Sequence, residues 1–295
     1  MRTCTDCEHW VLGIPCGHCG HPQGYYRPTS DIMVFEDAGE DCPLNRLRCD
    51  MIKNPTLFEE KLKKRVQDLG IKGAVIGISG GKDSTIVAKL MSDILGKENV
   101  LGVLMPNGKQ SDIDVSNEVV KILGINSVVV NIGNSMNGLD LQVFNALRSI
   151  SKDLTEDAFV NMPPRIRMTT LYAIAQSMGH GWRVIGTTNK SEEYIGWLTK
   201  WGDGAADFEP ILDFTVTELR ELGVNLGIPK HLVYKVPIDG LAEGTDEDRF
   251  GFTYDMLDKY IETGTCGDKK VDEKIEKMHN GSEHKRNPVP TIKFC

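Results

Sequence analysis

The sequence predicts an α/β protein in which helices cover both faces of a parallel sheet, a doubly wound arrangement. Four apolar runs are typical of buried strands and occupy residues 74–76, 99–106, 127–132 and 182–186. Amphipathic patterns between these runs predict helices over residues 56–69, about 83–95 and 112–123. Because ligands of such sheets bind at the carboxyl ends of the strands, polar residues after each run are the candidates for function.

Composition and charge are typical of a globular protein in water. The chain has 295 residues, of which 40% are hydrophobic and 26% charged, with a formal net charge of −8. The negative charge disfavours a broad nucleic-acid-binding face. No apolar run is long enough to cross a membrane, and the first residues do not resemble a signal peptide. We therefore expect a cytoplasmic protein whose cysteines are thiols or metal ligands.

The strongest chemical signal is a glycine-rich stretch between the first predicted strand and its helix. It consists of Gly77, Ile78, Ser79, Gly80, Gly81, Lys82, Asp83 and Ser84. A turn of this kind presents backbone N–H groups and the positive end of a helix to an anion. It is not a Walker A motif, because Asp83 follows Lys82. An acid beside a phosphate indicates a bridging cation, so Asp83 is a candidate Mg²⁺ ligand. The alternative is an ordinary glycine-rich turn.

A second polar segment, 187–192, follows the predicted strand 182–186. Glu192 lies on the helix expected to begin there and can bring a second carboxylate to a metal at Asp83. The alternative is a solvated acid that interacts with the helix dipole. The loop 199–207 holds Asp203 and Asp207, which can accept hydrogen bonds from ribose hydroxyls. A plain charged loop is the alternative there.

The remaining patterns predict further helices. Pro163 and Pro164 are expected to begin one, with Arg165 and Arg167 on different sides of it. Two weakly defined helical stretches occupy residues 133–160. Another helix is expected over 215–226, with Thr215 and Glu218 as a capping box. The last two are expected over 250–261 and, partly exposed, over 263–280.

Residues 1–50 are expected to form a separate small module, because they hold six of the eight cysteines and lack a clear helical period. The pairs Cys4/Cys7 and Cys16/Cys19 can supply four thiolates to a structural Zn²⁺, with Cys42 as a possible replacement for one of them. A metal would stabilise a segment too polar to build a core. A redox-active pair and a metal-free extension are the alternatives.

The glycine-rich stretch resembles the pyrophosphate loop of the N-type ATP pyrophosphatases. Together with segments 164–168, 186–192, 199–207 and 283–286, in that order, it resembles the ammonia-dependent NAD synthetases over roughly residues 56–293. The resemblance implies an adenine nucleotide alpha hydrolase-like fold over residues 51–295. It also implies a homodimer that amidates deamido-NAD with ATP, Mg²⁺ and ammonia. The products would be NAD, AMP and pyrophosphate, formed through an adenylate.

The resemblance also implies the site residues. The loop from Gly77 to Ser84 would hold the ATP phosphates and Thr187 would contact ATP, while Asp83 and Glu192 would bind Mg²⁺. The residues implied to hold deamido-NAD are Arg165, Lys200, Asp203, Asp207, His284 and Lys285. The catalytic residues would be Asp83, Glu192 and Lys200, acting by positioning and charge neutralisation. Fifty residues are too few for a glutaminase domain, so ammonia is expected free or from a separate partner protein.

Three positions depart from the family pattern. Val216 replaces a lysine that contacts ATP phosphate, Ile238 replaces a Thr or Ser, and Leu104 replaces an arginine seen in some members. Restoring the lysine at Val216 is expected to raise kcat/KM for ATP, unless a nearby lysine already compensates; the candidates are Lys82, Lys109 and Lys190. The alternative functions are amidation of a different carboxylate and nucleotide binding with reduced or no turnover.

Overall fold

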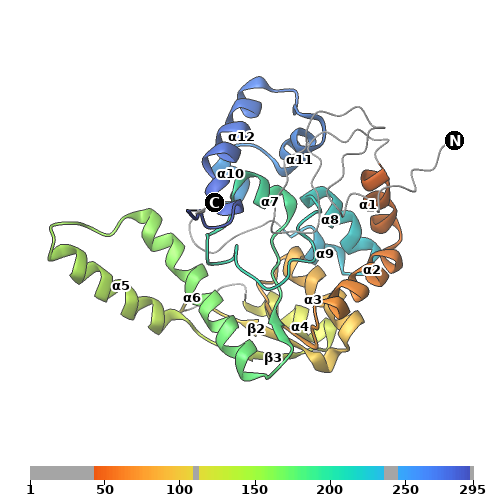
Figure 1. Ribbon diagram of the computed structural model, residues 1–295, viewed down its shortest axis with the longest axis horizontal. Helices are drawn as coiled ribbons and strands as arrows, with labels where there is room; N and C mark the ends of the chain where they lie inside the picture. The colour runs from red at the N-terminus through yellow and green to blue at the C-terminus, as the bar shows by residue number, and fades with distance from the viewer. Residues whose placement is uncertain (1–42, 109–112, 236–244, 293–295) are drawn as a thin grey trace.

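A computed structural model describes residues 43–108, 113–235 and 245–292 (Figure 1). The predicted zinc ligands Cys4, Cys7, Cys16, Cys19 and Cys42 lie outside the described residues, as do Lys109 and Ile238. Among the helices that are described, none combines the length and apolar composition that a membrane span needs.

Within the described ranges, a four-stranded parallel sheet with the order β3-β2-β1-β4 forms the centre of the protein. Its strands are β1 (Gly73–Gly77), β2 (Val100–Leu104), β3 (Asn126–Val129) and β4 (Trp182–Val184). Val75 of the central strand β1 pairs with Leu101 on one side and Val184 on the other. All four apolar runs are therefore confirmed as parallel strands. Their carboxyl ends lie at the same edge of the sheet, where the glycine-rich loop follows β1.

One face of the sheet carries the larger apolar core. Ala74 and Ile76 point to this face while Val75 points to the opposite one, as the two-residue period of a strand requires. Helices on the side of Ala74 and Ile76 contribute Phe58, Ile86 and Leu219 among other buried residues. These helices are α1 (Pro43–Lys53), α2 (Pro55–Asp68), α3 (Lys82–Leu95), α4 (Ile113–Leu123), α8 (Val216–Asn225) and α9 (Lys230–Val233). A short 3₁₀ helix, η2 (Lys97–Asn99), leads into β2.

The opposite face is covered by α6 (Glu156–Ser177), which buries Met168, Leu171 and Ala175 against the sheet. The expectation that Pro163 and Pro164 begin this helix is wrong. The helix begins earlier because the Thr155 hydroxyl accepts a hydrogen bond from the N–H of Ala158, and both prolines are buried inside it. The first part of α6 and α5 (Gly133–Arg148) form an arm that extends from the body (Figure 1).

The C-terminal region forms a third cluster around helix α7 (Lys190–Ile195). Its helices are α10 (Asp246–Phe250), α11 (Tyr254–Thr263), α12 (Lys269–Gly281) and α13 (Glu283–Arg286). Phe250, Tyr254 and Ile275 pack with Ile195 of α7 in one buried group. The helix expected over 250–261 is confirmed as α11, which begins at Tyr254 because Gly251, with a left-handed φ of 73°, ends the preceding helix α10.

Helix α1 packs against α2 and α8, so the chain joins the α/β body before residue 51. Ile52 is buried in the larger core, and the Arg48 Nε donates a 2.7 Å hydrogen bond to Glu218 Oε1 of α8. The predicted module boundary at residue 50 falls inside this helix.

A substitution at Gly73 would test the packing of the first residue of β1 against Trp182, the first residue of β4. A Cβ at this position would lie 2.3 Å from Trp182 Cδ2, a separation that forces the indole ring to move. We expect Gly73→Ala to lower the free energy of unfolding by about 1–3 kcal/mol, as overpacking does elsewhere. Urea denaturation measures this change. Gly138→Ala in α5 is the control, because a Cβ there meets nothing within 4 Å and should be neutral or stabilising. Equal stability of Gly73→Ala and the parent would contradict the packing.

Candidate functional site

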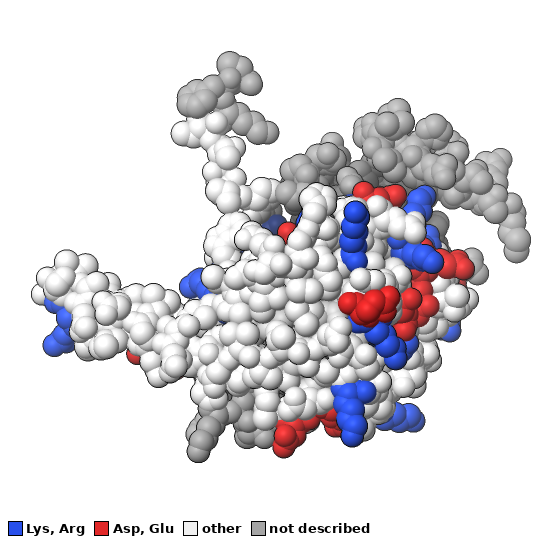
Figure 2. All heavy atoms as spheres, turned by 90° about the horizontal axis from the view of Figure 1, so that it is seen from below, with Lys and Arg blue, Asp and Glu red and all other residues white. Residues whose placement is uncertain are grey.

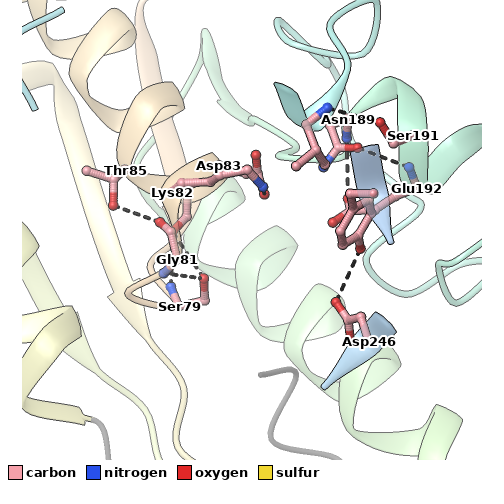
Figure 3. Close-up of polar contacts among 12 residues, drawn as sticks. Ser79, Gly81, Lys82, Asp83, Thr85, Asn189, Ser191, Glu192 and Asp246 are labelled. Carbon is pink, nitrogen blue, oxygen red and sulfur yellow. Dashed lines mark hydrogen bonds and ion pairs between the residues drawn. The ribbon is translucent and has the colours of Figure 1, made fainter. Parts of the chain in front are cut away.

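The glycine-rich loop joins β1 to α3 and folds around its own serines. The Ser79 Oγ accepts a 3.2 Å hydrogen bond from the Gly81 N–H, and the Ser84 Oγ accepts a 3.3 Å bond from the Ser79 N–H (Figure 3). Gly80 has a φ of 77°, and a Cβ there would lie 3.1 Å from the Ser116 backbone nitrogen. Glycine is therefore required at this turn, which brings the start of α3 to the carboxyl end of β1.

Two charged residues open α3. The Lys82 ammonium lies 2.9 Å from Asp83 Oδ2, and only 5% of Lys82 is exposed. The second carboxylate oxygen of Asp83, Oδ1, is buried and has no hydrogen-bond partner among the described residues. A buried anionic oxygen without a partner is costly. Asp83 Oδ1 is therefore suited to act as a ligand of a bound cation.

Helix α7 brings Glu192 to the same place. Asn189 caps α7: its Oδ1 accepts a 3.0 Å bond from the Glu192 N–H, while Glu192 Oε2 accepts a 3.4 Å bond from the Asn189 N–H. Figure 3 shows Asp83 directed from α3 toward the elements that carry Asn189 and Glu192. Burial, and next the negative charge of Asp83, raise the pKa of Glu192 well above its usual value. The two carboxylates thus repel each other, and the Lys82 ammonium offsets only part of this repulsion.

Asp246 of α10 is a third acid near this pair, and no sequence pattern distinguishes it from the other acids at the start of that helix. It is buried, its Oδ2 accepts a 3.3 Å hydrogen bond from the Tyr254 hydroxyl, and its charge also contributes to the raised pKa of Glu192. Even so, no group of three or more potential ligand side chains in the described part of the chain is arranged to hold a metal. Asp83 and Glu192 fit a Mg²⁺ ion whose other ligands are phosphate oxygens and water.

The loop after β4 gathers most of the residues implied to hold the second substrate. Arg165 Nε donates a 3.3 Å bond to the carbonyl of Lys200, and Lys200 Nζ donates to the carbonyl of His284. Lys285 Nζ donates 2.7 Å bonds to the carbonyls of Gly196 and Leu198, and burial lowers its pKa. The tail 283–286 therefore lies against the loop, although these two lysines already bond to the backbone.

The two aspartates of this loop also bond to the backbone. Asp203 Oδ1 accepts a 2.8 Å bond from the Thr199 N–H, and burial raises its pKa. Asp207 Oδ2 accepts a 2.9 Å bond from the Val184 N–H at the end of β4. Burial and the neighbouring Asp207 raise the pKa of Tyr172 to about 12, its hydroxyl lying 3.4 Å from Asp207 Oδ1. Both acids therefore stabilise the conformation of the loop through backbone hydrogen bonds. The second oxygen of Asp207, Oδ1, accepts a hydrogen bond from the Tyr172 hydroxyl.

A hollow of about 690 Å³ lies between α6 and this loop. It is lined by Met168, Thr169, Tyr172, Ala173, Gln176, Trp201, Gly204, Ala205 and Ala206. Trp201 has a φ of 64°, uncommon for a residue other than glycine, and the residue is 60% exposed. An aromatic side chain held in such a conformation beside a hollow is suited to contact a ligand ring.

Glu209 is a functional candidate that the sequence did not reveal, because it follows the loop as an isolated acid. Its Oε2 accepts a 3.2 Å bond from the Thr188 N–H, next to the expected ATP contact Thr187. A Cβ at Gly186 would lie 1.9 Å from Glu209 Oε1, so glycine alone leaves room for this carboxyl group. Burial raises the pKa of Glu209 to about 8. Glu209 therefore fixes the backbone at the carboxyl end of β4.

Of the three positions that depart from the pattern implied by the resemblance, the two in the described ranges lie in apolar surroundings. Val216 is fully buried with Phe250 and Tyr254, and Leu104 is 1% exposed within the core. The charges that act on Lys190 are chiefly those of Arg48 and Glu218, and burial lowers its pKa. An ammonium at position 216 would have to be buried, so the expected gain from Val216→Lys no longer follows.

The raised pKa of Glu209 predicts a pH-dependent stability. Its folded pKa is about 8 against an ordinary 4.5, so its protonation stabilises the folded state below pH 4.5 and this contribution is lost as the pH rises to about 8. We expect the free energy of unfolding of the parent to fall relative to Glu209→Gln by up to about 1.4 kcal/mol per pH unit in this window. Denaturant unfolding from pH 5 to 9 measures the difference, with the exposed Glu60→Gln as control. A pH-independent difference would refute the assignment.

Comparisons with known proteins agree with this geometry. A sequence model of the NAD synthase family matches residues 56–289. The chain is 40% identical over 222 residues to the NH₃-dependent NAD⁺ synthetase of Methanococcoides burtonii, covering 74% of this chain and 82% of that protein. The corresponding Pyrococcus horikoshii protein is 37% identical over 243 residues, with coverages of 77% and 90%. The solved NMN synthetase of Francisella tularensis has a TM-score of 0.71 at 33% identity, covering 82% of this chain and 99% of its own. The chain therefore belongs to the NAD synthase family.

Proposed function

We propose that the protein is an ammonia-dependent NAD synthetase. The observation that carries the proposal is the meeting of Asp83, from the pyrophosphate loop, with Glu192, from the strand-end segment of β4. In this reaction a carboxylate oxygen of deamido-NAD attacks the α-phosphorus of ATP and pyrophosphate leaves. Ammonia then attacks the acyl carbon of the adenylate, AMP leaves, and NAD is formed. The proposed setting is the cytoplasm.

Different groups of the protein would have different roles in the first step, the formation of the adenylate. The loop and the first N–H groups of α3 would hold the departing pyrophosphate, at the positive end of the helix. Asp83 and Glu192 would hold Mg²⁺, which when bound neutralises charge on the phosphates. Lys82 remains paired with Asp83 and orients that carboxylate. No protein nucleophile is needed, because positioning and charge neutralisation suffice for this chemistry.

The second substrate would lie along the loop 199–207 and the tail. Its proposed contacts are Arg165, Lys200, Asp203, Asp207, His284 and Lys285, with Thr187 on ATP. Support comes from the contacts that gather these residues: Arg165 with Lys200, Lys200 with His284, and Lys285 with the loop backbone. The hollow beside Trp201 and Tyr172 adjoins Asp207 and has room for a ring of the dinucleotide.

We also propose that two copies of the chain associate through the arm. Figure 2 shows the arm as largely uncharged, with basic side chains near its tip. Its exposed large apolar residues are Leu139, Leu141, Phe144, Ile150 and Phe159. Only Gly133 and Met136 of α5 are buried, so most of this helix lacks cover within the described part of one chain. A second copy would cover it and bring two sites together.

A second candidate substrate is a mononucleotide. One of the similar solved structures is named an NMN synthetase, whose name refers to a mononucleotide product, and this chain has a buried Val216 where the resemblance implies a lysine. The purified protein should therefore be assayed with ATP, Mg²⁺ and ammonia, together with either deamido-NAD or nicotinic acid mononucleotide. We expect AMP and NAD from the dinucleotide. AMP only with the mononucleotide would reassign the substrate, and ATP binding without AMP from either would indicate a binding protein.

The metal role of Asp83 predicts a specific loss. Asp83→Asn keeps the size of the side chain but removes its charge, so we expect turnover to fall at least about a hundredfold with little change in thermal stability. Steady-state NAD formation and thermal unfolding provide the two readouts. The matched control is Asp153→Asn, because that carboxylate is exposed and pairs with Arg148 near the tip of the arm. Ordinary turnover of Asp83→Asn at ordinary Mg²⁺ would refute the role.

We further propose one structural Zn²⁺ per chain, held by Cys4, Cys7, Cys16 and Cys19, with Cys42 as a possible replacement. The support is the spacing of the cysteines. Elemental analysis of protein purified without chelator should find about one zinc per chain. The double variant Cys4→Ser/Cys7→Ser should lose it while the α/β body stays folded, whereas Cys266→Ala should retain it. Protein without zinc would remove the proposal.

A further inference from the structure

Helix α7 is short for an element that carries a metal ligand. It has six residues, Lys190–Ile195, and a helix of this length is not stable alone in water. The capping box of Asn189 satisfies only its first N–H groups. The position of Glu192 relative to Asp83 therefore depends on what holds the rest of α7.

A half-buried arginine holds the C-terminal end of α7. Arg286 Nη1 donates hydrogen bonds of 3.3 Å to the Glu193 carbonyl and 3.0 Å to the Tyr194 carbonyl. The same nitrogen lies 2.7 Å from Ser282 Oγ, and Nη2 donates to the carbonyl of His279. A cation at the last carbonyls of a helix satisfies exposed acceptors and interacts favourably with the dipole. Arg286 thus ties α7 to the end of α12.

A buried carboxylate holds the other end. The Ser191 Oγ of α7 donates to Asp258 Oδ1 of α11 and also accepts a 3.0 Å bond from the Val216 N–H. Asp258 Oδ2 accepts bonds of 2.8 Å from the Thr217 N–H and 2.6 Å from the Thr217 hydroxyl. Asp258 is 6% exposed, so these bonds are protected from water. One side chain therefore fixes the start of α7 to both α8 and α11.

Helix α7 also packs closely against residues 279–282. Gly196, which ends α7 with a φ of 66°, lies so close to the tail that a Cβ would be 2.1 Å from Ser282 Cβ. The ring of His279 stacks on Tyr194 with centroids 4.2 Å apart, and its Nδ1 lies 2.8 Å from the Tyr194 carbonyl. Any shift of the tail is therefore transmitted to α7.

From this geometry we propose that Arg286 and Asp258 are positioning residues for Glu192: they clamp α7 at both ends and keep its carboxylate opposite Asp83. The inference rests on the proposed function, because it assumes that Glu192 binds Mg²⁺. It assigns the last residue of the segment 283–286 a role that differs from substrate contact. Partners that orient a metal ligand typically change metal affinity about 10- to 100-fold when removed.

The test measures the Mg²⁺ requirement for binding a non-hydrolysable ATP analogue, by titration calorimetry at a series of Mg²⁺ concentrations. We expect Arg286→Gln to raise the half-saturating Mg²⁺ concentration about tenfold, and Arg286→Lys to raise it less because it keeps the charge. Arg220→Gln is the matched control, since that arginine pairs with Asp255 on the surface of the same region. A lowered melting temperature with an unchanged Mg²⁺ requirement would make Arg286 merely structural and overturn the proposal.

A double-mutant cycle shows whether the effect passes through Glu192. In a Glu192→Gln background, Arg286→Gln should add no further shift, whereas additive shifts would contradict the proposal. If Arg286→Gln does not fold, Ser282→Ala and Asp258→Asn weaken the same two contacts more gently and should each raise the Mg²⁺ requirement. Binding is scored separately from NAD formation. Mg²⁺-dependent binding without NAD would therefore refute the proposed substrate while leaving the cycle readable.

Discussion

The repulsion between Asp83 and Glu192 is the constraint on which the site depends. The two carboxylates come from different strand ends and meet where burial raises the pKa of Glu192, and Asp83 Oδ1 has no described hydrogen-bond partner. The Lys82 ammonium offsets part of this repulsion, and the arrangement favours a further cation. A divalent ion with phosphate oxygens as its other ligands removes the repulsion. Nucleotide and metal are therefore expected to bind together, each completing the surroundings of the other.

The fold supplies the rigidity that this pair needs from three separate sources. The parallel sheet aligns the ends of β1 and β4, which places the pyrophosphate loop beside the segment leading to α7. Glu209 fixes the backbone at Thr188, just after β4, from inside the protein. The C-terminal helices then hold α7 through Asp258 and Arg286. The helices after residue 245 thus hold α7 in position and also bury apolar residues of the third cluster.

The sheet, most helices and the phosphate loop could be predicted because their signals are local. Apolar runs and helical periods are read within a few residues, and Ala74 to Ile76 needed no partner to be recognised. The prolines at 163 and 164 misled because the Thr155 hydroxyl caps that helix at an earlier position, and that cap is itself a local signal. The roles of Glu209, Asp246 and Arg286 could not be predicted, since each depends on a contact between segments distant in sequence.

Val216 shows how one apolar residue alters the charge balance of the site. It is buried beside Tyr254, whose hydroxyl faces Asp246, so the third apolar cluster reaches the edge of the three acids. Lys82 contacts this group of acids but is already paired with Asp83. Position 216 supplies no positive charge, so backbone N–H groups of the loop and a bound metal would have to balance the charge of the phosphates. The positions of Glu192 and α7 therefore matter to this site, because Glu192 is one of the two acids that would hold the metal.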